Sequence, residues 1–363
     1  MPILETAAVG GGIALVLLGL ADAFLTILHP DWDGPVSTAA NRLTWRAAVT
    51  TARAWPKARR EALSLAGPFM VLSDVLLWIT VPIVGYALIV WPFMDTAFDT
   101  PPGVERTFVD ALYFSGVTFT SLGFGDITPT SPLWELLAVS EAVSGLLVMS
   151  AAIAYIVSVF EGVDQRDALA LRVYSETGGT WDGNQLLQRS LEDEGLEVLR
   201  KRLEALAEML RELHGRLYRF HGLAFYLRTR GLRHGPERML YALTEVALSA
   251  NLLARAPGLR PLRPAAEHFT FAFEHFASAV IRRHGTREAR RLMRDPEPAP
   301  EDASALAAEW RALATQLRLQ DPENPPYEDP ALLVLTARKR IFLEQVDQFT
   351  CWKSLRDDAG ERP

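Results

Sequence analysis

The sequence predicts an all-α membrane protein that carries an additional helical soluble part, and three observations lead to this fold class. The 363-residue chain is 49% hydrophobic, and its apolar residues gather in blocks before about residue 160. Three of these blocks are long enough to cross a membrane as helices. Residues 164–363 are rich in Leu, Ala, Arg and Glu, with helical apolar periodicity and no alternating strand pattern.

The first membrane helix is predicted within residues 1–30, where an apolar run extends from Ala7 to Leu28. At about 1.5 Å per residue this run can cross a hydrocarbon layer of roughly 30 Å. A cleaved signal peptide is the alternative. Such a peptide begins with basic residues, whereas residues 1–6 contain Glu5 and neither Lys nor Arg. A retained transmembrane helix is therefore the favoured interpretation.

Two further spans are predicted, an outer helix over residues 66–94 and an inner helix over 132–160. The apolar helix predicted between them, at 107–120, is too short to cross, which favours a re-entrant segment shielded by protein. Basic residues concentrate in the 31–65 linker, and acidic residues dominate the segment between the outer and inner helices. The positive-inside rule then places the amino terminus outside and the carboxy-terminal part in the cytoplasm, in a multi-pass protein of the cell membrane.

The 31–65 linker is predicted to lie at the inner membrane surface and to contact lipid. Arg42, Arg46 and Arg53, together with the nearby Trp45 and Trp55, fit an amphipathic interfacial helix. No span carries Arg or Lys at every third position, as a voltage sensor requires. Gating by a voltage sensor is therefore not expected.

The segment that follows the short helix suits a backbone ribbon that coordinates cations. It reads Ser-Leu-Gly-Phe-Gly-Asp over residues 121–126. A dehydrated cation needs several oxygens in place of its water shell, and successive carbonyls supply them if the backbone alternates between left- and right-handed conformations. Glycine adopts the left-handed ones without steric cost, so Gly123 and Gly125, two residues apart, suit such a ribbon. The preceding helix would direct the negative end of its dipole at the ion path.

This ribbon resembles the selectivity filter of the two-span bacterial potassium-channel pore modules, which reads Thr-Val-Gly-Tyr-Gly followed by Asp. The resemblance covers residues 66–160 and implies a homotetrameric pore module with potassium ions at the filter carbonyls only. The filter residues would be Ser121, Leu122, Gly123, Phe124 and Gly125, with the Ser121 hydroxyl at the inner end. Thr120 and Asp126 would support them. Phe124 departs from the family by lacking the tyrosine hydroxyl that ties the filter to the pore helix.

Gly145, on the inner helix, lies twenty positions after Gly125. The family carries a glycine about there that lets the inner helix bend during gating. Small residues also let membrane helices approach one another, so a packing glycine is an equal alternative.

Three acidic residues, Asp22, Asp74 and Glu141, fall inside the predicted spans. Acids in a membrane are costly, so each should face protein or water. Glu141 is expected to support the filter from behind, with Thr118 or Tyr113 as its hydrogen-bond partner.

The cytoplasmic domain, residues 164–363, is predicted to be all-helical. A leucine heptad from Leu196 to Leu227 fits a coiled coil between subunits or a helix packed within its own subunit. Two histidine pairs, His214 with His221 and His268 with His275, are spaced by seven residues. Two helical turns separate each pair by about 10 Å, which favours ordinary histidines over a metal site.

Composition excludes several other classes of function. The net charge of −7 gives no indication of a nucleic-acid partner. The single cysteine, Cys351, excludes an internal disulfide and a metal site built on thiolates. Neither a nucleophile–base pair nor a phosphate-binding loop is present, so we expect no enzyme and no cofactor apart from the permeant K⁺.

The sequence thus predicts a potassium-selective channel subunit that is regulated through its cytoplasmic domain, by a ligand or partner that the sequence does not identify. Two alternatives stay open. One is a weakly selective cation channel, and the other is a membrane-anchored sensor or scaffold with a non-conducting pore fold.

Overall fold

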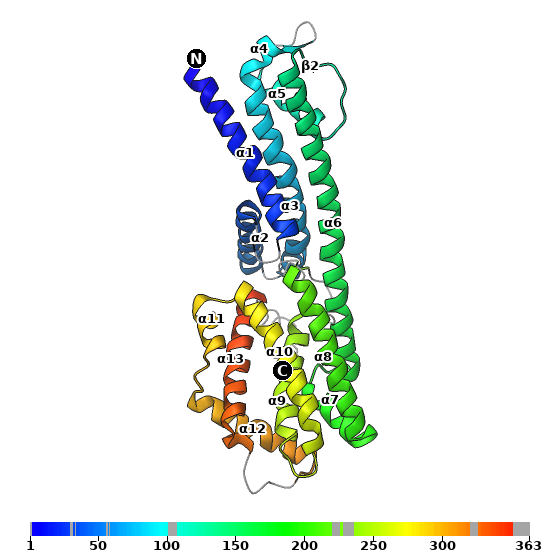
Figure 1. The fold of residues 1–363 in the computed structure, drawn as a ribbon. Helices are drawn as coiled ribbons and strands as arrows, with labels where there is room; N and C mark the ends of the chain where they lie inside the picture. Colours follow the sequence, from blue (N-terminus) through cyan, green and yellow to red (C-terminus); the bar gives the residue numbers. More distant parts are fainter. Residues whose placement is uncertain are drawn as a thin grey trace. The chain divides into compact units, whose positions relative to one another are not determined.

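The computed structural model confirms the all-α class and divides the chain into two compact units (Figure 1). The first unit comprises Met1–Ala54 and Leu65–Phe160, and the second comprises Trp55–Ser64 and Glu161–Pro363. The structure describes residues 2–29, 32, 34–55, 57, 59–100, 107–219, 226–227, 236–319 and 326–350.

Three helical stretches among the described residues are long and apolar enough to cross a membrane, as expected for a multi-pass membrane protein: Ile3–Leu28, Glu61–Ala97 and Pro132–Glu176. They correspond to α1 (Pro2–Leu28), to α3 (Arg59–Val90) with the short helices that follow it, and to α6 (Pro132–Glu176). The linker contains α2 (Pro35–Ala54), which buries Ser37 and Ala52 and exposes Arg42, Arg46 and Arg53. The basic residues of the linker helix are thus on its exposed face.

Small residues hold α1 against α3. A Cβ added at Gly12 would lie 2.5 Å from the carbonyl oxygen of Gly85, and one added at Gly85 would lie 2.8 Å from that of Gly12. Gly19 is equally close to the ring of Pro82. Larger residues at these positions would separate the helices, so the additional amino-terminal helix packs by close backbone approach.

The segment between the two long helices α3 and α6 forms one end of this unit. After η2 (Trp91–Phe93) and α4 (Met94–Ala97), β1 (Phe98–Asp99) pairs antiparallel with β2 (Thr128–Pro129), in the register Phe98↔Pro129. The short helix α5 (Phe108–Phe119) lies between the two strands in sequence. The sequence did not predict this strand pair, which ties the residues after the glycine-rich ribbon to the end of α4.

The inner helix differs from its expected bounds. The sequence predicts a helix over 132–160 and a short connector after it, whereas α6 continues without interruption to Glu176. Gly162 does not end the helix, since a glycine in a helix interior costs only about 1 kcal/mol. Beyond it, Leu169, Ala170 and Val173 are fully buried in a hydrophobic cluster that stabilises the extra turns.

The second unit is built from helices and short turns of 3₁₀ or π type. Their bounds are α7 (Gly183–Arg189), η3 (Ser190–Glu194), α8 (Leu196–Arg219), α9 (Pro236–Leu253), η6 (Arg260–Leu262), α10 (Arg263–His284), α11 (Arg287–Arg294), α12 (Pro300–Gln316), η7 (Pro326–Glu328) and α13 (Pro330–Thr350).

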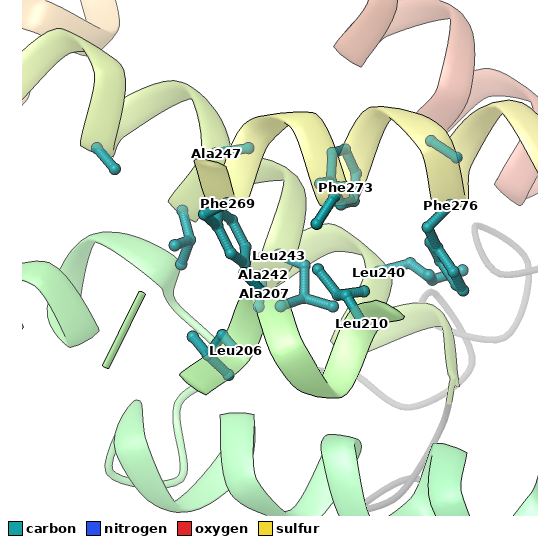
Figure 2. Packing of buried hydrophobic residues seen from close by; sticks show 14 of the residues in the cluster. Leu206, Ala207, Leu210, Leu240, Ala242, Leu243, Ala247, Phe269, Phe273 and Phe276 are labelled. Atoms are coloured by element: carbon teal, nitrogen blue, oxygen red, sulfur yellow. The ribbon is translucent and has the colours of Figure 1, made fainter. Parts of the chain in front are cut away.

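The leucine heptad packs within its own subunit over the described residues. Figure 2 shows Leu206 and Leu210 of α8 among side chains of α9 and α10, including Leu243 and Phe269. The further heptad leucines of α8 at positions 199, 203 and 213 are buried in the same cluster. The Leu217 side chain and residues 220 and 224 lie outside the described part. These leucines are therefore core residues rather than the seam of an intersubunit coiled coil.

The histidines that the structure describes are not grouped as metal ligands. Among the described residues, no group of three or more His, Cys, Asp or Glu side chains could hold a metal ion. Burial lowers the pKa of His214, and the positive charge of Arg282 and the nearby His275 lower it further. His221 and Cys351 lie outside the described residues.

Candidate functional site

The predicted filter begins directly at the end of the pore helix α5 and is hydrogen-bonded to it. The Ser121 amide donates to the Thr118 carbonyl at 3.0 Å, and the Leu122 amide donates to the Val117 carbonyl at 2.9 Å. The Thr120 hydroxyl donates to the Gly116 carbonyl of α5 at 2.6 Å. The carboxy-terminal end of α5 therefore anchors the first residues of the ribbon.

The ribbon alternates in backbone handedness. Ser121, Gly123 and Gly125 have φ angles of 59°, 58° and 75°, whereas Leu122 and Phe124 do not have positive φ. Such alternation lets successive carbonyls point to one side. The two glycines were expected in left-handed conformations on sequence grounds. Ser121 was not, although it precedes Gly123 by the same two-residue step.

A single chain does not enclose this ribbon. Residues 121–126 are all exposed, and the apolar side chains of Leu122 and Phe124 are 63% and 66% exposed. Ile127, which follows, is buried in a cluster with Phe98 and Phe114. The ribbon is thus fixed at both ends and uncovered between them.

Tyr113 of α5 links the pore helix to the far end of the ribbon. Its hydroxyl donates to Asp126 Oδ2 at 2.8 Å, and its ring stacks on Phe124 with centroids 6.5 Å apart and planes 10° apart. Phe124 has no hydroxyl for this purpose, so here the hydroxyl comes from the pore helix. The sequence did not predict this role of Tyr113. Its one sequence signal is the spacing of thirteen residues between an aromatic hydroxyl and the acid after the predicted filter.

We expect Tyr113→Phe to weaken the filter while leaving the fold intact, because it removes the hydrogen bond to Asp126 and keeps the stacked ring. We expect the population of the ordered filter to fall severalfold at most. The loss is modest because the Tyr113–Asp126 hydrogen bond is exposed in one chain. The measurement is the melting temperature of the purified protein at increasing potassium concentrations. The quantity compared between variants is the concentration that gives half of the maximal stabilisation. Tyr86→Phe is the matched control, because the Tyr86 hydroxyl makes only a long contact of 3.4 Å with Ser144. An equal response in both variants would contradict the role of Tyr113.

Glu141 lies behind the pore helix, as expected, but not with the expected partners. Its side chain is fully buried, and neither carboxylate oxygen makes a hydrogen bond to Thr118 or Tyr113. Its polar neighbour is Ser115 of α5, also fully buried, without a hydrogen bond of normal geometry. Tyr113 is unavailable because it bonds to Asp126.

Gly145 of α6 lies directly against the end of the pore helix. A Cβ added there would overlap the carbonyl oxygen of Phe119 and come within 2.7 Å of its carbonyl carbon. This close approach by itself requires glycine. The packing alternative therefore has a specific structural basis, and α6 is continuous through this position. Bending at Gly145 stays a prediction.

Comparison with known proteins identifies the class to which this site belongs. Residues 75–162 match the model of a family described as "Ion channel". This segment contains the second half of α3, the pore helix α5, the ribbon and α6 as far as residue 162. The resemblance to two-span channel pore modules is therefore confirmed, and the family points to a transport-type role rather than an enzymatic one.

A curated relative agrees with the membrane assignment. The chain is 28% identical over 165 residues to the uncharacterized membrane protein YdjJ of Bacillus subtilis (strain 168). The alignment covers 45% of this chain and 47% of the relative, so the chain spans about half the length of that protein. No solved structure matches the chain.

Proposed function

We propose that this protein is the subunit of a potassium-selective channel that conducts passively through the Ser121–Gly125 ribbon. The observation that carries the proposal is the left-handed backbone at Ser121, Gly123 and Gly125, inside the segment that matches the ion-channel family. Backbone carbonyls that replace a hydration shell are the means by which potassium filters coordinate their ion.

Each part of the proposed filter has a distinct role. The carbonyls of residues 121–124 would line the ion sites, and the Ser121 hydroxyl would close the inner end. Thr120 and Asp126 would hold the ribbon through their hydrogen bonds to Gly116 and Tyr113. The end of α5 would contribute its partial negative charge to the ion path. The protein would need no cofactor, because K⁺ is the permeant ion.

A homotetramer completes the site. One chain supplies one ribbon, and a cage of carbonyls needs four of them around an axis. The exposed Leu122 and Phe124 side chains support this proposal, because they leave apolar surface that neighbouring subunits and their pore helices would cover.

Gating is proposed to be independent of a voltage sensor and subject to control by the second unit. The three apolar helices carry no ladder of basic residues in the described part of the chain. Following the positive-inside rule, we propose that the second unit lies in the cytoplasm, where a ligand or partner could act on it.

Ion flux from liposomes tests the proposal. Purified protein is reconstituted with K⁺ or Na⁺ as the sole internal cation, and efflux is followed after dilution. We expect K⁺ efflux at least about tenfold faster than Na⁺ efflux. Equal efflux of the two ions would favour the weakly selective cation channel. No efflux of either ion from folded protein would favour the non-conducting sensor or scaffold.

A further inference from the structure

A buried polar cluster joins four helices of the first unit. Asp22, near the end of α1, accepts hydrogen bonds from the Val36 amide at 2.7 Å, the Ser37 hydroxyl at 2.5 Å and the Trp78 indole at 3.1 Å. The Ser37 amide donates as well. Two of these amides belong to the first turn of α2, so this carboxylate caps that helix.

Asp74 on α3 has a different environment. It is fully buried, and its Oδ2 atom accepts from the Asn41 side-chain amide of α2 at 3.1 Å and from the Tyr155 hydroxyl of α6 at 3.0 Å. Its Oδ1 atom has no hydrogen-bond partner. The same is true of the Asn41 Oδ1 atom, although both atoms are buried.

No positive charge compensates Asp74 within the part of the chain that the structure describes. The titratable groups that act on it are Asp22 from α1 and Tyr155 from α6, while α2 presents the uncharged Ser37 and Asn41. A carboxylate buried in an apolar surrounding without a cation is costly, and a second carboxylate nearby adds to that cost.

A single proton satisfies both unpaired atoms. We propose that Asp74 is a proton-binding site, protonated on Oδ1 and donating from there to the Asn41 Oδ1 atom. With the amide bond from Asn41 to Oδ2, this donation closes an acid–amide ring of two antiparallel hydrogen bonds. The ring fastens α2 to α3, and its closure removes the buried charge.

The same proton affects the inner helix, because Tyr155 of α6 shares the Oδ2 atom. Tyr155 also packs edge-on against Trp78, with ring centroids 5.0 Å apart, and Trp78 donates to Asp22. Loss of the proton leaves two facing acceptors between α2 and α3 and a new charge beside Asp22. The Tyr155 hydroxyl of α6 then donates to a charged acceptor, which is a stronger hydrogen bond. The coupling to conduction rests on the proposed channel function: if α6 lines the pore of that channel, deprotonation tightens a restraint on the helix.

Infrared spectroscopy of the full chain in lipid tests the site without reference to conduction. The carbonyl stretch of a protonated carboxyl group should be present at neutral pH, and Asp74→Asn should remove it. Glu141 is another buried acid, so Glu141→Gln is the matched control and should retain the Asp74 band. If Asp74→Asn does not fold, Asn41→Leu should shift the band, because the proton loses its acceptor. A wild-type spectrum without an Asp74 band at neutral pH overturns the proposal.

Flux measurements test the coupling to α6. An asparagine at position 74 can donate to Asn41 and accept from Asn41 and Tyr155, so Asp74→Asn reproduces the protonated arrangement. Wild-type K⁺ efflux should fall severalfold from neutral to alkaline pH, while Asp74→Asn stays at the neutral level. Efflux with the same pH dependence in both proteins overturns the coupling. Absence of efflux from both would count against the channel function and leave the infrared result to decide the site.

Discussion

Replacing Gly123 with valine is expected to abolish potassium flux through the reconstituted protein. Gly123 has a φ angle of 58°, and nothing lies within 4 Å of a Cβ added there, so the obstacle is the backbone conformation and not space. A left-handed conformation costs a residue with a side chain about 1–2 kcal/mol, and more for a β-branched one. In the proposed homotetramer the strain recurs in each of four subunits, so flux should fall roughly a hundredfold or more.

Gly11→Val is the matched control for Gly123→Val. Gly11 also has nothing within 4 Å of an added Cβ, but it lies in α1 and its φ is not positive. This variant should conduct like the wild type. Undiminished K⁺ flux in Gly123→Val would show that residues 121–125 are not the filter.

Gly145→Ala is expected to damage the filter even though it adds only one methyl group. The added Cβ would overlap the carbonyl oxygen of Phe119, which is the last residue of the pore helix. Overpacking of this kind costs about 1–3 kcal/mol per site and displaces the backbone that it touches. The Val117 and Thr118 carbonyls that hold the filter follow that backbone, so K⁺ flux should fall at least about tenfold.

Two measurements on Gly145→Ala separate packing from hinge bending. A packing defect lowers the potassium dependence of thermal stability, since the proposed filter then holds its ions less well. A stiffened hinge changes the open probability and leaves ion binding by the filter intact. Gly11→Ala is the control, with open space around its added methyl group. Normal potassium-dependent stability in Gly145→Ala would contradict a role in packing.

The signals that predict the fold from sequence are strong where the physical constraint is strong. A membrane requires about twenty consecutive apolar residues, and α1, α3 and α6 meet this requirement in the sequence itself. The short helix α5 begins at Phe108, after Thr107, whose backbone amide donates a hydrogen bond to Asp110 Oδ2 at 2.7 Å. Glycines two residues apart after such a helix leave few alternatives to a left-handed alternation.

The features that the sequence does not predict are contacts between residues that lie far apart in the chain. The sequence does not show whether Tyr113 donates its hydrogen bond to Asp126 or to Glu141, because both side chains end in a carboxylate that can accept it. The continuation of α6 past Phe160 follows from burial of Leu169 and Val173, and burial is a property of the folded unit. The heptad of α8 is equally compatible with packing against another subunit and with packing against helices of its own subunit. Only the positions of the neighbouring helices in the structure decide between them.

The exposure of the Ser121–Asp126 ribbon in one chain has a genetic consequence. Each ion site would be shared among subunits, so one distorted ribbon would interrupt the whole carbonyl ring. In cells that express Gly123→Val and wild-type chains equally, random mixing would leave only about one assembly in sixteen without an altered chain. Such a variant would act dominantly: the residual current would fall far below half, in contrast to a protein whose site is complete within each chain.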